Sequence, residues 1–258
     1  MDTTTEPVSD TVVNQRQQAR VDLAAAFRQA VLDDFHEGIS NHLTLNVPGL
    51  PGRFYLNGYG LHWTEVTASN LLEVTYDGQI ANGSGIADQT AVCIHGPIHR
   101  LVPDAQCVMH THMPYCTALS QLEDMTLEMT GQSAIYFHNK IAYDHHYNGF
   151  ADDLSEGERL ADVMGGKPVL MLANHGVVVT GKTVASAYYR LYYLERACRT
   201  QMFSMWTGQR RRVIEAAILD KVTAQGKAPS ITRQRPFSDY MFDAIKRGLD
   251  RTQPDYAR

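Results

Sequence analysis

The chain has 258 residues, of which 44% are hydrophobic and 20% charged, and its formal net charge is −5. This composition is ordinary for a globular protein, and without an extended basic surface it argues against binding to nucleic acid. No segment approaches the ~20 consecutive apolar residues of a membrane span, so we expect no membrane association.

The start of the chain and its cysteines indicate a cytoplasmic protein. Residues 1–11 are mostly polar and lack the charged and then apolar pattern of a secretion signal. The four cysteines lie in apolar runs without CxxC spacing, which favours reduced core residues. We expect a mobile tail over residues 1–14, followed by a single domain over residues 15–258.

The first half of the chain combines one helix with several strands. A helix is predicted over residues 15–38, where Gly38 is a natural helix stop. Strands are predicted at residues 43–47 and 54–56, around a turn rich in proline and glycine, and at residues 72–76. The apolar residues of the helix repeat every four positions: Leu23, Phe27, Val31 and Phe35.

The second half alternates helices and strands around a less regular middle at residues 136–149. Asp88 is expected to cap a helix over residues 89–101, and residues 107–112 are predicted to form a buried strand. The later elements are a helix at 156–164, strands at 169–172 and 177–179, a long helix at 183–205, a loop at 224–229 and a helix at 238–249. A C-terminal helical extension is expected from about residue 222. The pattern predicts an α/β fold, a three-layer αβα sandwich around a mainly antiparallel sheet.

Two histidines separated by one residue give the strongest chemical signal. His110 and His112 end the predicted buried strand, where alternate residues project from the same face. Two imidazoles that point the same way can share a divalent cation. For this short motif alone, the alternative is a pair of ordinary core or surface histidines.

A third histidine lies between two predicted strands. His175 follows Asn174 and precedes Gly176, a glycine that relieves the backbone of a sharp turn. Taken alone, it is equally a simple turn residue. Together with His110 and His112, it suits a facial three-histidine site with open positions for a substrate.

Three segments of the chain resemble the class II aldolase and adducin family. They read EGISNHLTLNVPG with the following FYLNGYGLHWTEVTASNLLEVTYDGQI, DQTAVCIHGPIHRLVPDAQCVMHTHMPYCTALS, and LMLANHGVVVTGKTVASAYYRLYYLERACRTQ. The resemblance covers residues 20 to about 205 and is closer to the adducin-like bacterial branch than to the sugar-phosphate aldolases. It implies that His110, His112 and His175 bind a divalent metal, zinc first, with manganese or iron as alternatives. It also implies a small-molecule substrate and a homo-oligomer, namely a tetramer.

The resemblance also assigns candidate substrate-binding residues. Where aldolases similar to this chain carry a Gly-Asn pair, it has Asn41 and His42, and Gly60 stands in the second phosphate-binding loop. Where they carry two serines before a helix, it has Gln89 and Thr90. Hydroxyl groups and exposed amides suit a phosphate dianion, so these losses favour a non-phosphorylated substrate.

Ala91 is the main departure from the family pattern. In the lyases and epimerases that this chain resembles, the position holds Glu or Asp, which acts as an acid or base. Asp88 lies one turn earlier, and we interpret it as the helix cap. His95, one turn after Ala91 on the same face, is the candidate catalytic proton carrier, with a buried and locally bonded histidine as the alternative. His42 is the other candidate, either as a donor to a bound hydroxyketone or as a histidine bonded locally.

The remaining polar residues are interpreted as structural. Asp104 is expected to orient the loop before the metal-binding strand, and Glu37 and Glu73 show no partner and read as surface acids. Three histidines of the irregular middle are within reach of the site, although solvated loop histidines are commoner: His138, His145 and His146.

The expected function is that of a metal-dependent carbon–carbon lyase, acting by aldol cleavage or decarboxylation through a metal-stabilised enediolate. The expected substrate is a small, non-phosphorylated hydroxy-keto or hydroxy-acid compound. One alternative is a non-catalytic, adducin-like assembly module, which Ala91 favours. Another is an Fe(II) oxygenase that uses the same three histidines.

Overall fold

A computed structural model describes residues 9–227 and 234–258. Within these ranges the strands form an eight-stranded sheet in the order β4-β3-β2-β1-β5-β8-β7-β6. All neighbouring strands are antiparallel except β6 and β7. The strands are β1 His42–Asn46, β2 Arg53–Leu56, β3 Leu72–Thr75, β4 Ile80–Asn82, β5 Cys107–Thr111, β6 Ile141–Asp144, β7 Val169–Leu172 and β8 Gly176–Gly181. The predicted mainly antiparallel sheet is confirmed.

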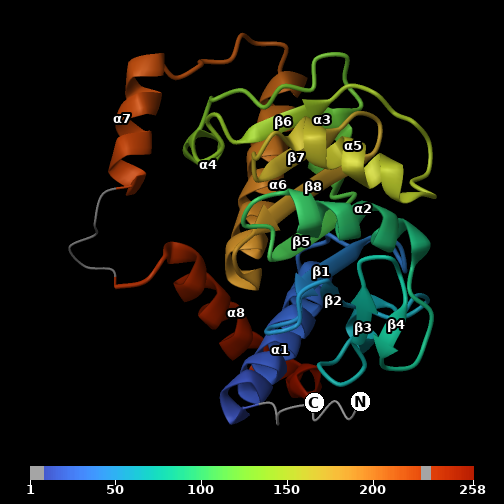
Figure 1. The fold of residues 1–258 in the computed structure, drawn as a ribbon. Coiled ribbons are helices and arrows are strands. Elements are labelled where there is room, and N and C mark those ends of the chain that lie inside the picture. The colour runs from blue at the N-terminus through green and yellow to red at the C-terminus, as the bar shows by residue number, and fades with distance from the viewer. Residues whose placement is uncertain (1–8, 228–233) are drawn as a thin grey trace.

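Helices cover both faces of the sheet (Figure 1). The α-helices are α1 Asp10–Leu32, α2 Gln89–Leu101, α3 Pro114–Ser120, α4 Gln132–Ile135, α5 Leu154–Met164, α6 Val184–Trp206, α7 Ala216–Lys227 and α8 Phe237–Thr252, and the short 3-10 helices are η1 Trp63–Glu65 and η2 Pro254–Ala257. The α1, α6 and α8 helices pack on one face, and α2 and α5 pack on the other. The three-layer αβα arrangement is therefore confirmed.

The two layers of core follow from the alternation of side chains along the central strands. On β5, Cys107 and Met109 lie in the core with α1 and α6, whereas Val108 lies in the core with α2 and α5. On β8, Val177 and Val179 point to the first core, and the residue between them to the second. Because a strand is buried on both faces, it reads as a continuous apolar run.

Close packing of α2 against α5 holds the helix that borders the site. Gly157 of α5 faces the backbone of α2, and a Cβ there would lie 2.0 Å from the carbonyl oxygen of Cys93. At the start of α2, the Asp88 side chain accepts hydrogen bonds from the backbone N–H groups of Thr90 (2.8 Å) and Ala91 (3.4 Å). The predicted role of Asp88 as a helix cap is confirmed.

The C-terminal end of the chain is anchored against α1. The buried guanidinium of Arg28 donates to the carbonyl of Val66 (2.8 Å) and to the carboxylate of Asp255 (2.7 Å). The backbone N–H of Ala68 donates to the carbonyl of Tyr256 (2.9 Å). These bonds satisfy a buried cation and join segments far apart in sequence.

Four local predictions need correction. The first helix begins at Asp10 and ends at Leu32, so residues 10–14 of the expected tail are helical, while residues 1–8 lie outside the described ranges. The irregular middle contains β6, which pairs with β7. Residues 224–227 of the expected loop belong to α7, and the rest of that loop is not described. Glu73 is no surface acid: its side chain is 9% exposed and accepts from Arg53 at 2.7 Å.

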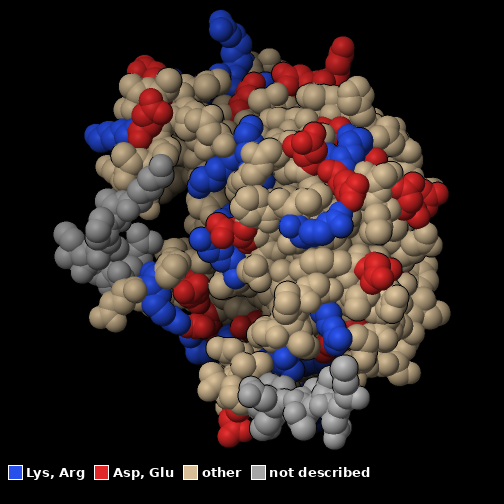
Figure 2. Space-filling view, in the orientation of Figure 1, with Lys and Arg blue, Asp and Glu red and all other residues tan. Residues whose placement is uncertain are grey.

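Positive and negative side chains are interspersed on the face shown in Figure 2. Within the described residues, several charged side chains form ion pairs. Arg159 of α5 contacts Asp144 of β6 (2.6 Å) and Glu156 (2.7 Å), and Arg211 contacts Glu128. Among the described helices, none combines the length and apolar character needed to cross a bilayer.

Candidate functional site

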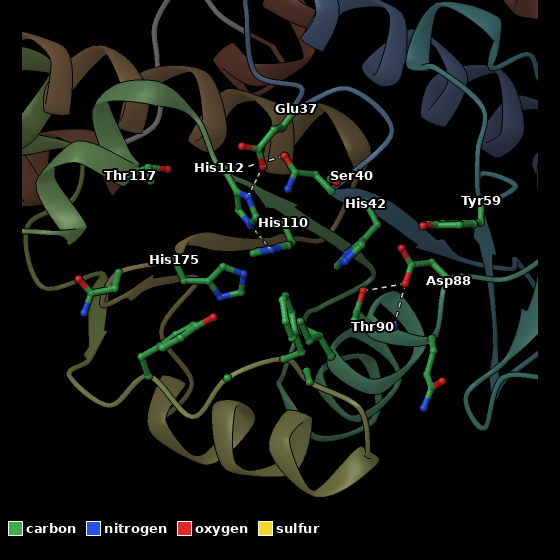
Figure 3. Close-up of a pocket in the computed structure, with 18 of the residues that line it drawn as sticks. Glu37, Ser40, His42, Tyr59, Asp88, Thr90, His110, His112, Thr117 and His175 are labelled. Carbon is green, nitrogen blue, oxygen red and sulfur yellow. Dashed lines mark hydrogen bonds and ion pairs between the residues drawn. The ribbon is translucent and has the colours of Figure 1, made fainter.

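A cavity of about 1050 Å³ opens where three parts of the sheet meet the start of α2 (Figure 3). The segment before β1, the end of β5 and the turn between β7 and β8 line one part of its wall. The rest is lined by residues 86–90, 147 and 149–151, by Tyr59 and Ile94, and by four residues of α3 and its C-cap: Pro114, Thr117, Ala118 and Gln121. The cavity therefore collects polar side chains from segments that are distant in sequence.

His110 and His112 enter this cavity from the end of β5. Each has its Nδ1 committed to an acceptor: His110 Nδ1 donates to the carbonyl of Val177 (3.0 Å), and His112 Nδ1 donates to the carboxylate of Glu37 (2.5 Å). In a neutral imidazole with Nδ1–H, the other nitrogen carries a lone pair. Both histidines thus present a bare Nε2 to the same space.

His175 completes the group from the β7–β8 turn. Asn174 takes a left-handed conformation with φ of 58°, and the N–H of His175 donates to the carbonyl of Leu172 at 3.2 Å. Gly176 is required here for space, because a Cβ would lie 2.5 Å from the carbonyl oxygen of Thr111 and 2.8 Å from the ring of His112. The glycine lets β8 approach β5 closely enough to bring the three rings together.

The geometry fits a divalent cation. One ligand nitrogen from each of His110, His112 and His175 lies within 4.8 Å of the others, and the Nε2 atoms of His110 and His112 are 3.1 Å apart. Two nitrogens bound to one zinc ion at about 2.1 Å in tetrahedral geometry would be about 3.4 Å apart. At 3.1 Å, the lone pairs of the two Nε2 atoms repel each other unless a cation or a proton lies between them.

Burial keeps the imidazoles of His110 and His175 in the neutral form that binds metals. Burial lowers the pKa of His175 to about 4, an effect to which the neighbouring His112 adds. Burial also lowers the pKa of His110 well below its ordinary value, with further contributions from His175 and His42. Neutral imidazoles are the ligands that zinc and related cations require.

Asn41 and His42 lie beside the three histidines, as their sequence position predicts. Asn41 adopts φ of 71° and accepts a hydrogen bond from the backbone N–H of His112 through Oδ1 (3.1 Å). Its buried Nδ2 has no partner among the described residues. His42 lines the same cavity, with its ring 5.0 Å from that of His110. A donor and an imidazole therefore flank the three-histidine group.

His95 and Gly60 lie elsewhere than their predicted roles require. His95 is fully buried behind His42 and does not line the cavity, so its position does not fit a direct proton carrier at a bound substrate. Gly60 does not line the cavity either, but its neighbour Tyr59 does. His95 is buried because its side of α2 faces β1 instead of solvent.

With alanine at position 91, the first turn of α2 contains no acid, and the nearest one is the cap residue Asp88. Ala91 is buried in an apolar cluster with Phe54 and Leu72. Of the acids that line the cavity, Glu37 is bonded to His112, whereas Asp88 uses only Oδ1 in its hydrogen bonds to α2. The second oxygen of Asp88 is therefore open to the cavity (Figure 3).

Sequence reasoning missed Glu37 and two residues behind the cavity. Glu37 reads as a surface acid, yet it bonds His112, 75 positions away in sequence. The Thr44 hydroxyl hydrogen bonds to both His95 and His99. The missed signal was periodic: Thr44 shares a strand face with His42, and His99 lies one helical turn after His95.

The other polar candidates lie away from the cavity wall. Asp104 takes a left-handed turn conformation and pairs with Lys182 at 3.1 Å. In the irregular middle, the cavity is lined by Tyr147 and Phe150 rather than by the predicted histidines: His138, His145 and His146. Tyr147 packs its ring 6.1 Å from that of His175.

The αβα fold and the three-histidine group define a class of protein, and sequence comparison names it. Residues 21–202 match the class II aldolase and adducin N-terminal domain. The chain therefore belongs to the class II aldolase and adducin family.

Individual relatives agree with this assignment. A provisionally named class 2 aldolase of Caulobacter vibrioides is 33% identical over 93% of this chain and 92% of its own length. An adducin-related protein of Schizosaccharomyces pombe is 35% identical over 70% of this chain, which spans only 57% of that protein. The crystal structure of an aldolase II superfamily protein from Pseudomonas syringae superposes with a TM-score of 0.87 and 35% identity, over 97% of this chain and 98% of that one.

Proposed function

We propose that this protein is a metal-dependent carbon–carbon lyase that acts on a small, non-phosphorylated hydroxy-keto or hydroxy-acid compound. His110, His112 and His175 would hold the divalent cation, with zinc as the first candidate and manganese or iron as the others. One observation carries the proposal. The Nε2 atoms of His110 and His112, which have no hydrogen, lie 3.1 Å apart, because the Nδ1 atoms of the same two rings are the hydrogen-bond donors. Family membership adds support.

When bound, a divalent cation stabilises negative charge on a carbonyl oxygen, which is the charge that an enediolate carries. The chain's own residues would orient the substrate. The unpartnered Nδ2 of Asn41 would donate a hydrogen bond to a substrate oxygen. The free Oδ2 of Asp88 would accept a substrate proton, the task that the family's Glu or Asp at position 91 would otherwise perform.

The charges around the cavity support a substrate without phosphate. Across the described residues, the cavity wall contains no lysine and no arginine, and it contains two acids, Glu37 and Asp88. A phosphate dianion is usually held by cationic side chains or by several N–H donors. A neutral hydroxyl-bearing compound, or one carboxylate bound to the cation, suits this wall better.

Exchange of hydrogen next to a carbonyl tests the proposal directly. Metal-loaded protein in D2O should exchange that hydrogen in dihydroxyacetone faster than in dihydroxyacetone phosphate, as followed by proton NMR. Asp88→Asn should slow exchange by about 10²-fold while retaining the helix cap, because Asn caps as well as Asp. Absence of exchange across a panel of hydroxyketones and hydroxy acids would refute lyase chemistry at this cavity.

The second candidate is a non-catalytic assembly module like adducin. It is favoured by the match to an adducin-related protein and by the alanine at position 91. A module of this kind needs no cation, so protein that binds no divalent metal would favour it. Tightly held iron would instead favour the oxygenase alternative.

We further propose a homo-oligomer, with a tetramer expected from the family, in the cytoplasm. Large apolar side chains at the cavity rim support a neighbour there: Phe150 is 87% exposed and Ile86 66% exposed. Exposed apolar side chains that gather in one place commonly mark contact surfaces.

A further inference from the structure

A line of buried hydrogen bonds runs behind the cavity from His42 into the protein. His42 Nδ1 lies 2.8 Å from His95 Nε2, and His95 Nδ1 lies 2.6 Å from the hydroxyl of Thr44. The same hydroxyl lies 2.8 Å from His99 Nε2, and His99 Nδ1 lies 2.7 Å from the carbonyl oxygen of Ala105. Four side chains thus connect the cavity wall to one backbone carbonyl.

Two elements build this line from their periodicities. His42 and Thr44 lie two residues apart on β1 and share one face of the sheet. His95 and His99 lie four residues apart on α2 and share one face of the helix. All four residues are at most 8% exposed, so the polar atoms that do not face the cavity need partners inside the protein.

The end of the line sets the direction of every hydrogen bond in it. The carbonyl of Ala105 can only accept, so His99 Nδ1 carries a hydrogen and, in the neutral ring, Nε2 accepts. Burial lowers the pKa of His99 to about 4, which keeps that ring neutral. The Thr44 hydroxyl must then donate to His99, which leaves its oxygen to accept from His95 Nδ1.

The hydrogen-bond directions are fixed as far as the cavity. With its hydrogen on Nδ1, neutral His95 accepts at Nε2, so His42 must donate from Nδ1 and has a bare Nε2. A competing acceptor for the Thr44 hydroxyl, the carbonyl of Val108, is 3.4 Å away. If the Thr44 hydroxyl donated to the Val108 carbonyl, His99 would have to carry its hydrogen on Nε2. Its Nδ1 lone pair would then face the Ala105 carbonyl oxygen at 2.7 Å. The geometry therefore allows only one direction for the hydrogen bonds of this line.

Nothing in the described protein occupies the bare nitrogen. His42 lines the cavity next to His110, and its Nε2 has no hydrogen-bond partner among residues 9–227 and 234–258. Figure 3 shows the His42 ring between the three-histidine group and Asp88. An acceptor in this position attracts a hydroxyl and repels a carbonyl or carboxylate oxygen.

We propose that Thr44 and His99 are positioning residues, which fix His42 as an Nδ1–H imidazole whose bare Nε2 accepts a hydrogen bond from a hydroxyl of the substrate. This role rests on the proposed function, because it assumes a hydroxyl-bearing compound bound at the neighbouring cation. It makes the line a determinant of specificity: the compound needs a donor at this position. His95 acts through His42 and not on the substrate.

Nitrogen NMR of histidine tautomers tests the proposal without any turnover. In 15N-histidine-labelled protein, two-bond correlations should show His42, His95 and His99 as Nδ1–H tautomers, and addition of dihydroxyacetone to metal-loaded protein should shift His42 Nε2. Thr44→Val should leave His99 as it is, release His95 and His42 into mixed tautomers, and weaken the dihydroxyacetone-dependent shift at least fivefold. Thr44→Ser, which keeps the hydroxyl, should restore the native pattern.

Three results would overturn the proposal. These are a native His42 with hydrogen on Nε2, a Thr44→Val protein with unchanged tautomers, and a His42 Nε2 signal that does not respond to dihydroxyacetone. Failure of the proposed lyase function would appear differently. In that case hydrogen exchange in D2O would be absent while the tautomers and the response of His42 remained as stated.

Discussion

The metal-binding form of His110 and of His112 depends on a single partner at the other ring nitrogen. His112 depends on Glu37, whose carboxylate holds its Nδ1 hydrogen, and His110 depends on the carbonyl of Val177. Partners of this kind orient the ring and raise the basicity of the ligand nitrogen. Of these partners, only Glu37 is a side chain, so it can be removed by substitution.

Glu37→Ala should weaken affinity for zinc by about 10–100-fold, because His112 loses the acceptor that fixes its tautomer. Folding should be unaffected, since the Glu37 side chain is 61% exposed. Competition with a chromophoric chelator measures the affinity. Glu158→Ala is the matched control, because Glu158 is 51% exposed and pairs with Arg100. Equal affinities in the two variants would contradict the role of Glu37.

At the scale of elements, the site depends on how closely β8 lies against the end of β5. The two strands pair from Cys107 with Gly181 to Thr111 with Val177. His175 lies in the turn directly before β8, so this pairing places it beside the end of β5. Space for that approach comes from the missing side chain at Gly176.

Gly176→Ala should lower the free energy of unfolding by about 1–3 kcal/mol, the usual cost of forced overpacking, and should abolish metal binding. Denaturant titration and metal analysis check the two effects. Gly248→Ala, in α8, should stabilise the protein by roughly 0.5–1 kcal/mol, since a Cβ there meets nothing within 4 Å. Tight metal binding by a stable Gly176→Ala protein would show that the approach of β8 is not required.

The elements with strong local signals could be predicted from the sequence, and those that depend on distant pairing could not. The α2 helix was expected at its observed bounds because Asp88 caps it and its apolar residues repeat. Strand β6 has little local pattern and exists because it pairs with β7, 28 residues later, as Ile141 with Val169. Glu37 was missed for the same reason, because its partner is remote. Spacing pairs His42 with Thr44 and His95 with His99, but the line through Thr44 also needs β1 and α2 packed together, which the spacing does not show.

At the scale of the whole molecule, buried neutral histidines make folding sensitive to acid. Burial lowers the pKa of His42 and of His99 to about 4, below the ordinary value of 6.5. Between these values the unfolded chain binds protons that the folded protein does not. Stability is therefore fully present above about pH 6.5 and is lost as the pH falls toward 4.

For metal-free protein, each such histidine should lower the free energy of unfolding by roughly 2 kcal/mol between pH 7 and pH 5. Urea titration at the two pH values measures this loss. His99→Phe should show a smaller loss, because the ring can stack on Phe54 and Tyr76 as His99 does but does not titrate. A wild-type stability that is flat over this range would contradict neutral burial of these rings.

The most direct test of the central claim is the metal content of purified protein. Wild-type protein should carry about one divalent cation per chain, zinc or manganese for a lyase. His112→Ala should carry none while its circular dichroism spectrum stays native. A folded His112→Ala protein with undiminished metal would contradict a centre built from His110, His112 and His175.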